Sequence, residues 1–130
     1  MVQRQTIYTQ AVTNAVQSLG HANNQDILEY LETSGITASP TTVHRVSRRL
    51  CDAGVIACAP SSSDGSMRYD ATVKQHDHFV CRGCDGVVDI KLGQAMRDEL
   101  NKQLDGCIID GQLIVYGSCK DCKIKEGVNL

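Results

Sequence analysis

The chain has 130 residues, a formal net charge of −2 and seven cysteines, with one Phe, four Tyr and no Trp. This charge excludes a generally basic nucleic-acid coat protein, although a single positive face is enough for specific DNA binding. No apolar run reaches the length of a membrane span and no signal-peptide core is evident, so we expect a cytoplasmic protein with no membrane partner. In a reducing cytosol the cysteines are expected to be thiolates rather than disulfides.

The N-terminal half is predicted to form three helices followed by a β-hairpin, which is the element order of a winged helix-turn-helix. Apolar residues at helical spacing predict a first helix that ends near Gly20 and a second helix over residues 24–32. A capping serine followed by Pro40 opens a third helix over residues 40–52. Two short strands around the polar turn at residues 61–65 complete the pattern.

The third predicted helix carries an unusual concentration of positive charge. Three of the four arginines in the first sixty residues fall within five positions on it. In a helix-turn-helix, the second helix of the motif lies in the major groove and its N-terminal residues reach base edges. A solvated helix face is the alternative, but the hairpin that follows favours DNA binding. The residues expected to contact DNA are Ser39, Thr41, Thr42, His44, Arg45, Arg48 and Arg49.

A change of character after residue 70 predicts two domains. We expect a DNA-binding domain, a hinge, and a dimerisation and metal-binding domain, at residues 1–70, 71–75 and 76–130. The last domain is predicted to contain strands around one helix over residues 93–104, with an Asp110-Gly111 turn between strands at residues 107–109 and 113–115. So small a domain buries little by itself, and we therefore expect a homodimer.

Two C-x-x-C pairs of identical spacing, Cys81/Cys84 and Cys119/Cys122, lie 34 residues apart. Each pair can bind one ion from a tight turn, and the two pairs together complete a tetrahedral all-sulfur shell. That shell is the usual ligand set of structural zinc. A redox-active C-x-x-C is the alternative, but it would need a βαβ context that neither pair has.

An H-x-H run, His76 and His78, lies just before the first cysteine pair. Because the four cysteines already fill one shell, these histidines indicate a second site with different chemistry. Nitrogen and oxygen ligands suit iron, manganese or zinc. A pair of surface histidines on one strand face is the plainer alternative. One site that holds the fold and another that responds to conditions is typical of a sensor.

Four segments, residues 41–45, 51–56, 76–84 and 116–122, together resemble the ferric-uptake-regulator (Fur) family over nearly the whole chain. The resemblance implies an α+β fold, with an N-terminal winged helix-turn-helix and a C-terminal small α/β dimerisation domain that holds a four-cysteine zinc site. It also implies a homodimeric, metal-dependent repressor that is not an enzyme and binds a palindromic double-stranded DNA operator. The implied ligands of the structural Zn2+ are Cys81, Cys84, Cys119 and Cys122.

The resemblance further implies a regulatory Fe2+ or Mn2+ site between the two domains, with the ligands His21, Asp70, His76, His78 and Asp89. Aspartate at both acidic positions resembles the peroxide-responsive (PerR) branch, where bound Fe(II) reacts with hydrogen peroxide and a coordinating histidine is modified. The alternative within the family is a reversible sensor of iron, zinc, manganese or nickel. A small non-haem iron enzyme and a zinc-ribbon interaction module are less favoured.

Several positions depart from the family pattern. The usual Gln-Arg pair is missing from residues 6–12, and His44 replaces the usual Tyr, so phosphate contacts and the operator stay open. Gln75 and Gly111 stand where some relatives carry histidine ligands of a further site, and we therefore expect two metals per chain. We expect the remaining cysteines to be small buried hydrophobes: Cys51, Cys58 and Cys107. Cys51 lies beside two arginines and is the candidate for a thiol sensor.

Overall fold

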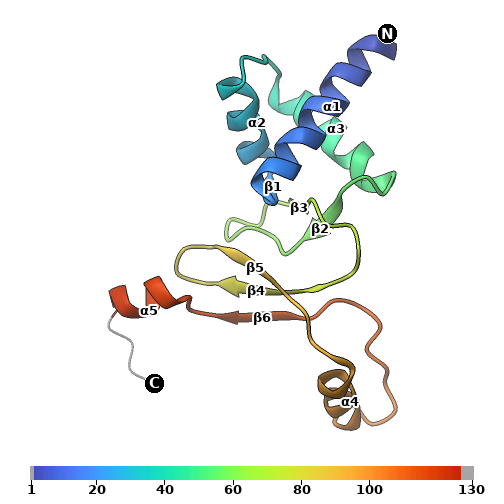
Figure 1. The fold of residues 1–130 in the computed structure, drawn as a ribbon, viewed down its shortest axis with the longest axis vertical. Coiled ribbons are helices and arrows are strands. Elements are labelled where there is room, and N and C mark those ends of the chain that lie inside the picture. The colour runs from blue at the N-terminus through green and yellow to red at the C-terminus, as the bar shows by residue number, and fades with distance from the viewer. Residues whose placement is uncertain (1, 127–130) are drawn as a thin grey trace. The chain divides into compact units, whose positions relative to one another are not determined.

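The computed structural model describes residues 2–126 (Figure 1), and their side chains are described over residues 7–123. Its contacts divide the chain into two compact units, Met1–Val73 and Lys74–Leu130. Within the part of the chain that the structure describes, none of the helices is both long and apolar enough to cross a bilayer.

The N-terminal unit contains three helices, α1 (Val2–Leu19), α2 (Asn24–Thr33) and α3 (Pro40–Asp52). The helix α2 starts at a capping box between Asn23 and Asp26, and α3 starts at Ser39, whose hydroxyl accepts the Thr42 N–H. The three helices pack on one another through an aliphatic core. Its most deeply buried residues include Val12, Ala15, Val16, Ile27, Leu31, Val43, Ile56 and Tyr69.

A three-stranded antiparallel sheet closes this unit. Its strands are β1 (His21–Asn23), β2 (Ala57–Ala59) and β3 (Arg68–Asp70), in the order β1-β3-β2. The three helices and the β2–β3 hairpin agree with the prediction from sequence. The sequence did not predict β1, because three residues between two helices show no strand periodicity. This strand places His21 directly opposite Asp70 on β3.

The C-terminal unit is a second small sheet with two helices. Its elements are β4 (Asp77–Cys81), β5 (Val87–Ile90), α4 (Gln94–Lys102), β6 (Ile114–Gly117) and α5 (Lys120–Glu126). The strand β4 is central: it pairs antiparallel with β5 and parallel with β6. His78 and the zinc-ligand candidate Cys81 both lie on this central strand, so β4 positions two kinds of site.

The predicted hairpin around Asp110-Gly111 is wrong. Residues 107–109 form no strand. The strand that follows, β6, instead pairs in parallel with β4, whereas a two-residue turn can join only antiparallel strands. The N–H of Ile109 instead donates to the Asn101 side chain at 3.0 Å. The predicted helix is present as α4, which has no buried residue within this chain, and its Met96 is 52% exposed.

Asp77 is the polar anchor of the C-terminal unit. Its buried carboxylate accepts the backbone N–H groups of Leu92 and Leu113 and is paired with the Arg97 guanidinium. Burial raises the pKa of this carboxyl, but the two N–H donors and the guanidinium outweigh that effect and hold the pKa below its ordinary value. The carboxylate thereby fastens the segments before α4 and β6 to the central strand.

We expect Asp77→Ala to destabilise the C-terminal unit by about 3–5 kcal/mol, since it leaves a partly buried guanidinium and two backbone N–H groups without their acceptor. Urea unfolding followed by circular dichroism measures the change. Asp98→Ala is the matched control, because Asp98 is exposed on α4 and should change stability by about 0.5 kcal/mol or less. Equal effects of the two substitutions would contradict the anchoring role.

Candidate metal centres and nucleic-acid interface

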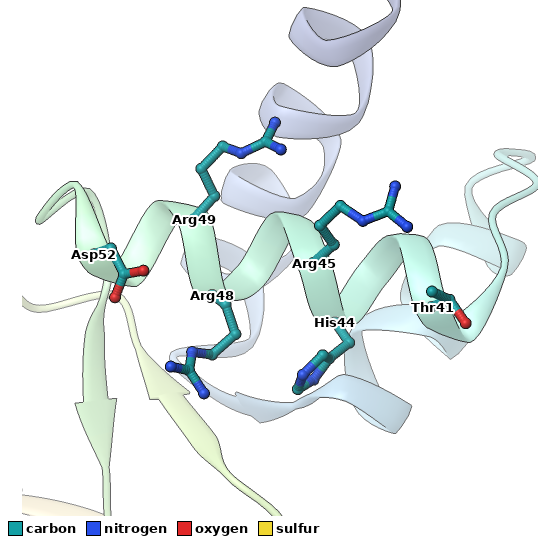
Figure 2. Close-up of a pocket in the computed structure, with 6 residues that line it drawn as sticks. All are labelled: Thr41, His44, Arg45, Arg48, Arg49 and Asp52. Carbon is teal, nitrogen blue, oxygen red and sulfur yellow. The ribbon is translucent and has the colours of Figure 1, made fainter.

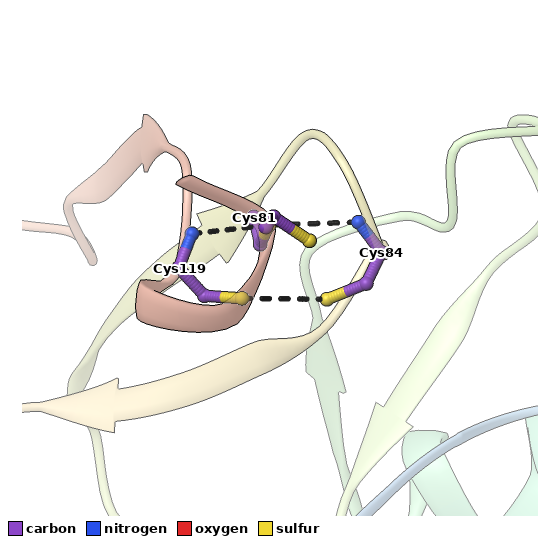
Figure 3. Close-up of side chains that lie close together, drawn as sticks. Cys81, Cys84 and Cys119 are labelled. Carbon is purple, nitrogen blue, oxygen red and sulfur yellow. Dashed lines mark hydrogen bonds between the residues drawn. The ribbon is translucent and has the colours of Figure 1, made fainter. Parts of the chain in front are cut away.

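Four cysteine sulfurs gather in the C-terminal unit, within 4.8 Å of one another. Cys81 ends β4, Cys84 lies in the turn that follows, Cys119 precedes α5 and Cys122 lies within α5. The Sγ atoms of Cys84 and Cys119 are 3.9 Å apart (Figure 3). Tetrahedral zinc with Zn–S bonds of about 2.3 Å separates its sulfurs by about 3.8 Å. The cluster therefore has the ligand type and the spacing of a structural zinc site.

Backbone groups prepare this cluster for a cation. The N–H groups of Cys119 and Cys84 donate to the Cys81 sulfur, at 3.2 Å and 3.5 Å, and lower the pKa of that thiol to about 6 (Figure 3). The pKa of Cys122 is raised to about 12, because the neighbouring sulfurs of Cys119 and Cys81 disfavour a further thiolate. One thiolate thus forms readily in the cluster, and a dication would allow the others to ionise.

The C-terminal unit also brings together His76, His78 and Asp89. His78 lies opposite Asp89 in the β4–β5 pairing, and the two imidazole rings are 4.4 Å apart. The Asp89 carboxylate oxygen Oδ1 lies 3.1 Å from Nε2 of His76 and 3.4 Å from Nε2 of His78. Two nitrogen donors and one carboxylate oxygen therefore converge on one point.

The other ring nitrogens of these histidines are held by oxygen acceptors. Nδ1 of His76 lies 2.7 Å from the Lys74 carbonyl, and Nδ1 of His78 lies 2.7 Å from Oε1 of Gln112. Each contact places a proton on Nδ1, so in the neutral ring the Nε2 lone pair faces the Asp89 carboxylate. A cation at that point would satisfy all three groups, and hydrogen bonds of this kind commonly orient histidine ligands. No sequence signal identifies Gln112 or the Lys74 carbonyl, because both are brought to the site by the fold.

The N-terminal unit contains a histidine–carboxylate pair of its own, His21 and Asp70. Strand pairing places them opposite each other, with Nε2 of His21 3.3 Å from Oδ2 of Asp70. The Asp70 carboxylate is buried, and its Oδ1 accepts the Thr72 N–H at 2.9 Å. This pair offers one nitrogen and one oxygen donor, the same ligand types as the histidine cluster of the C-terminal unit.

The exposed side of α3 is strongly polar. Thr41, His44, Arg45, Arg48, Arg49 and Asp52 line an open depression along this one helix (Figure 2). Arg45 and Arg49 project to one side of the helix, and His44 and Arg48 project to the other. Asn24 on α2 contacts Nδ1 of His44 at 3.0 Å, an orienting contact that sequence reasoning missed. At the N-cap of α3, the Ser39 hydroxyl donates a hydrogen bond to the Thr42 hydroxyl and accepts one from the Thr42 N–H.

Residues 2–115 match the ferric uptake regulator family. The chain belongs to this family. Its members are transcriptional regulators rather than enzymes, and they respond to metals. The prediction of the family from the cysteine pairs, the H-x-H run and the α3 segment is therefore confirmed.

Relatives within the Fur family include both peroxide and iron regulators. The chain is 42% identical over 66 residues to the transcriptional regulator PerR of Clostridium acetobutylicum, a match that covers 48% of this chain and only 46% of that protein. It is 28% identical over 113 residues to the peroxide operon regulator of Bacillus subtilis, which covers 85% of this chain and 77% of that protein.

Solved structures of Fur-family proteins share the fold. The ferric uptake regulator from Francisella tularensis with iron matches with a TM-score of 0.72 at 22% identity, over 89% of this chain and 91% of that chain. The peroxide stress regulator of Campylobacter jejuni matches with a TM-score of 0.69 at 20% identity, over 92% of each chain. At these identities the likeness concerns the fold, and it confirms a Fur-like α+β architecture.

Two of the three cysteines outside the four-cysteine cluster differ from expectation. Cys58 and Cys107 are exposed and Cys51 is partly buried, so the prediction that they are small buried hydrophobes is wrong for the two exposed residues. Cys58 lies on β2, whose three residues include none that is buried, and Cys107 lies in the strandless segment after α4. Burial, followed by the neighbouring Cys58 sulfur, raises the pKa of the Cys51 thiol to about 11.

Proposed function

We propose that this Fur-family protein is a metal-dependent DNA-binding repressor that senses hydrogen peroxide through Fe(II)-catalysed oxidation of a histidine ligand. The observation that carries the proposal is the convergence of two fixed histidine Nε2 atoms on the Asp89 carboxylate. Nitrogen and oxygen donors of this kind suit Fe2+ or Mn2+. Bound Fe2+ would supply the redox chemistry, while the histidines supply an oxidisable ring within its reach.

We propose that His21 and Asp70 complete the ligand set, so that one regulatory ion takes ligands from both units. Each half is formed by strand pairing within its own unit, which fixes the donors of that half without a metal. An ion shared by two units joined through a hinge at residues 71–75 would favour one arrangement of the units over others. A preference of about 3 kcal/mol for the DNA-binding arrangement changes affinity roughly a hundredfold.

The four-cysteine cluster is proposed to hold Zn2+ as a structural ion, because zinc in an all-thiolate shell is redox-silent and adds folding free energy. A homodimer is supported by the apolar residues that the C-terminal unit exposes. A two-fold symmetric dimer suits a palindromic double-stranded DNA operator. These exposed large apolar residues are Val88, Met96, Leu104, Ile108, Ile114, Val115 and Tyr116.

We propose that the three helices and the β2–β3 hairpin act as a winged helix-turn-helix, with α3 in the major groove. The first consequence concerns Arg45, which is exposed on α3. Arg45→Ala should weaken operator binding by about tenfold to a hundredfold, the usual cost of losing one arginine contact. Fluorescence anisotropy on an operator selected in vitro with the wild-type protein, at several salt concentrations, measures the loss.

A lysine on the other unit provides the control for Arg45→Ala. Lys102→Ala removes the same charge from α4, where the side chain is exposed, and should leave operator affinity unchanged. Equal losses for the two variants would indicate a general charge effect and would remove the case for α3 as the reading helix.

Peptide mass spectrometry after peroxide treatment tests the sensing mechanism. Protein loaded with Fe2+ and given stoichiometric peroxide should gain one oxygen atom on the tryptic peptide of residues 75–82, which contains His76 and His78, or on the peptide that contains His21. Fragment spectra locate the oxygen. The Mn2+-loaded protein is the control and should stay unmodified, because Mn2+ does not carry out this reaction.

The second candidate is a reversible metal sensor, in which binding and release of iron, zinc, manganese or nickel is the whole signal. Relatives named as ferric uptake regulation proteins, such as that of Neisseria gonorrhoeae at 25% identity over 107 residues, favour it. Unmodified histidine peptides in protein that still binds Fe2+ would support this candidate and reject peroxide sensing.

A further inference from the structure

Two cysteines that belong to neither metal site lie against each other in the N-terminal unit. Cys51 is in the last turn of α3 and Cys58 is the middle residue of β2. Their Sγ atoms are 3.2 Å apart, closer than the 3.9 Å between Cys84 and Cys119 in the zinc cluster. Both are free thiols.

The turn between α3 and β2 holds this pair in place. The N–H of Gly54 donates to the Cys51 carbonyl at 3.1 Å, and the N–H of Val55 donates to the Leu50 carbonyl at 3.0 Å. Gly54 has a φ of 76°, which glycine adopts without strain and which ends the helix sharply. The chain therefore reverses within a few residues and returns β2 past the end of α3.

From this geometry we propose that Cys51 and Cys58 are a redox-active pair, which hydrogen peroxide oxidises to a disulfide within the DNA-binding unit. A disulfide bond is about 2.05 Å long, so the sulfurs need to approach by only about 1.1 Å. Rotation about the side-chain torsions supplies a movement of that size, and the backbone of the turn can stay in place.

The exposure of the two thiols assigns their roles. Cys58 is exposed and Cys51 is partly buried, so peroxide reaches Cys58 first. The Cys58 thiolate attacks one peroxide oxygen: an S–O bond forms, the O–O bond breaks, and the departing hydroxide takes a proton to become water. The Cys51 sulfur then attacks the sulfenic sulfur of Cys58. An S–S bond forms, the S–O bond breaks, and a second water leaves, so two thiols are oxidised and one peroxide is reduced.

The position of the pair makes this a second route for peroxide that needs no metal. Cys51 follows Arg48 and Arg49 by less than one helical turn, and the disulfide would join the end of α3 directly to β2. The disulfide would also protect both sulfurs from further oxidation to sulfinic acid. Dithiol reductants would restore the two thiols. Peroxide would thus modify the N-terminal unit reversibly and without a metal.

The test uses the zinc-loaded 130-residue protein, from which the regulatory metal has been removed by a mild chelator. After peroxide treatment, the protein is unfolded, alkylated and digested with trypsin. Residues 50–68 form one tryptic peptide that contains both Cys51 and Cys58. We expect most of this peptide to be unalkylated and lighter by two hydrogen atoms. Treatment with a phosphine reductant before alkylation should restore two alkylated cysteines.

Variants at the three cysteines separate this pairing from general thiol oxidation. Cys58→Ser should abolish the disulfide in the 50–68 peptide, and Cys51→Ser should do the same. Cys107→Ser is the matched control, since it removes an exposed thiol elsewhere and should leave the disulfide yield unchanged. Two alkylated cysteines after peroxide, or disulfides that link Cys51 or Cys58 to another peptide, would overturn the proposal.

Discussion

Replacing Cys119 with serine should release the zinc and unfold the C-terminal unit. The variant keeps the backbone N–H of residue 119 that donates to the Cys81 sulfur, so it removes a ligand rather than the turn. Zinc binding contributes on the order of 10 kcal/mol in small zinc peptides, which equals or exceeds the whole stability of a typical domain. Zinc content after gel filtration, together with sedimentation velocity, should show a metal-free monomer or aggregate.

Cys107→Ser is the control for this experiment, because it removes an exposed thiol of the same unit that lies outside the zinc cluster. It should retain stoichiometric zinc and the assembly state of the wild-type protein. If Cys119→Ser also retained its zinc and its dimer, the four-cysteine cluster would not be the structural centre that its geometry indicates.

Asp89→Ala should abolish the effect of metal on DNA binding while leaving the protein folded. The carboxylate is the point on which both histidine Nε2 atoms converge, and it is 42% exposed, so its loss leaves no buried cavity. In the wild-type protein we expect Mn2+ to raise operator affinity by roughly a hundredfold over chelated protein. In the variant, affinity should stay at the chelated level at Mn2+ concentrations that saturate the wild-type protein, as measured by anisotropy.

Two further variants sharpen the result. Asp98→Ala removes an exposed carboxylate from α4 and should keep the full metal response. Asp70→Asn tests the other half of the proposed ligand set and should lose the response to the same extent as Asp89→Ala, if one ion uses both halves. A normal response in Asp70→Asn would confine the regulatory site to the C-terminal unit.

Local signals in the sequence predicted the parts of the structure that depend on neighbouring residues. The Ser39-Pro40 cap predicted the start of α3, and Val43, Val46 and Leu50 recur at helical spacing on the face that is buried in the core. The two C-x-x-C pairs predicted a cluster of four sulfurs, because tight turns bring each pair together. The helix start and each C-x-x-C turn are local features, whereas the parallel pairing of β4 with β6 brings the two cysteine pairs together.

The features that the sequence did not reveal depend on contacts between distant segments. The three-residue strand β1 exists because β3 offers it a partner, and nothing within His21–Asn23 indicates pairing. The Asp110-Gly111 turn signal was overridden, because β6 runs parallel to β4 and the Asn101 side chain takes the N–H of Ile109. Likewise, Gln112 orients His78 across 34 residues of chain, a contact that no local pattern encodes.

The short strand β4 carries residues of both candidate metal centres of the C-terminal unit. His78 and Cys81 are three residues apart on it, which corresponds to about 10 Å along an extended strand. A Zn2+ ion with four thiolates has a net negative charge, so it attracts a second dication at that distance. Zinc in the four-cysteine cluster would therefore also act as a fixed counter-charge, and we expect the metal affinity of the His76, His78 and Asp89 site to depend on whether that zinc is bound.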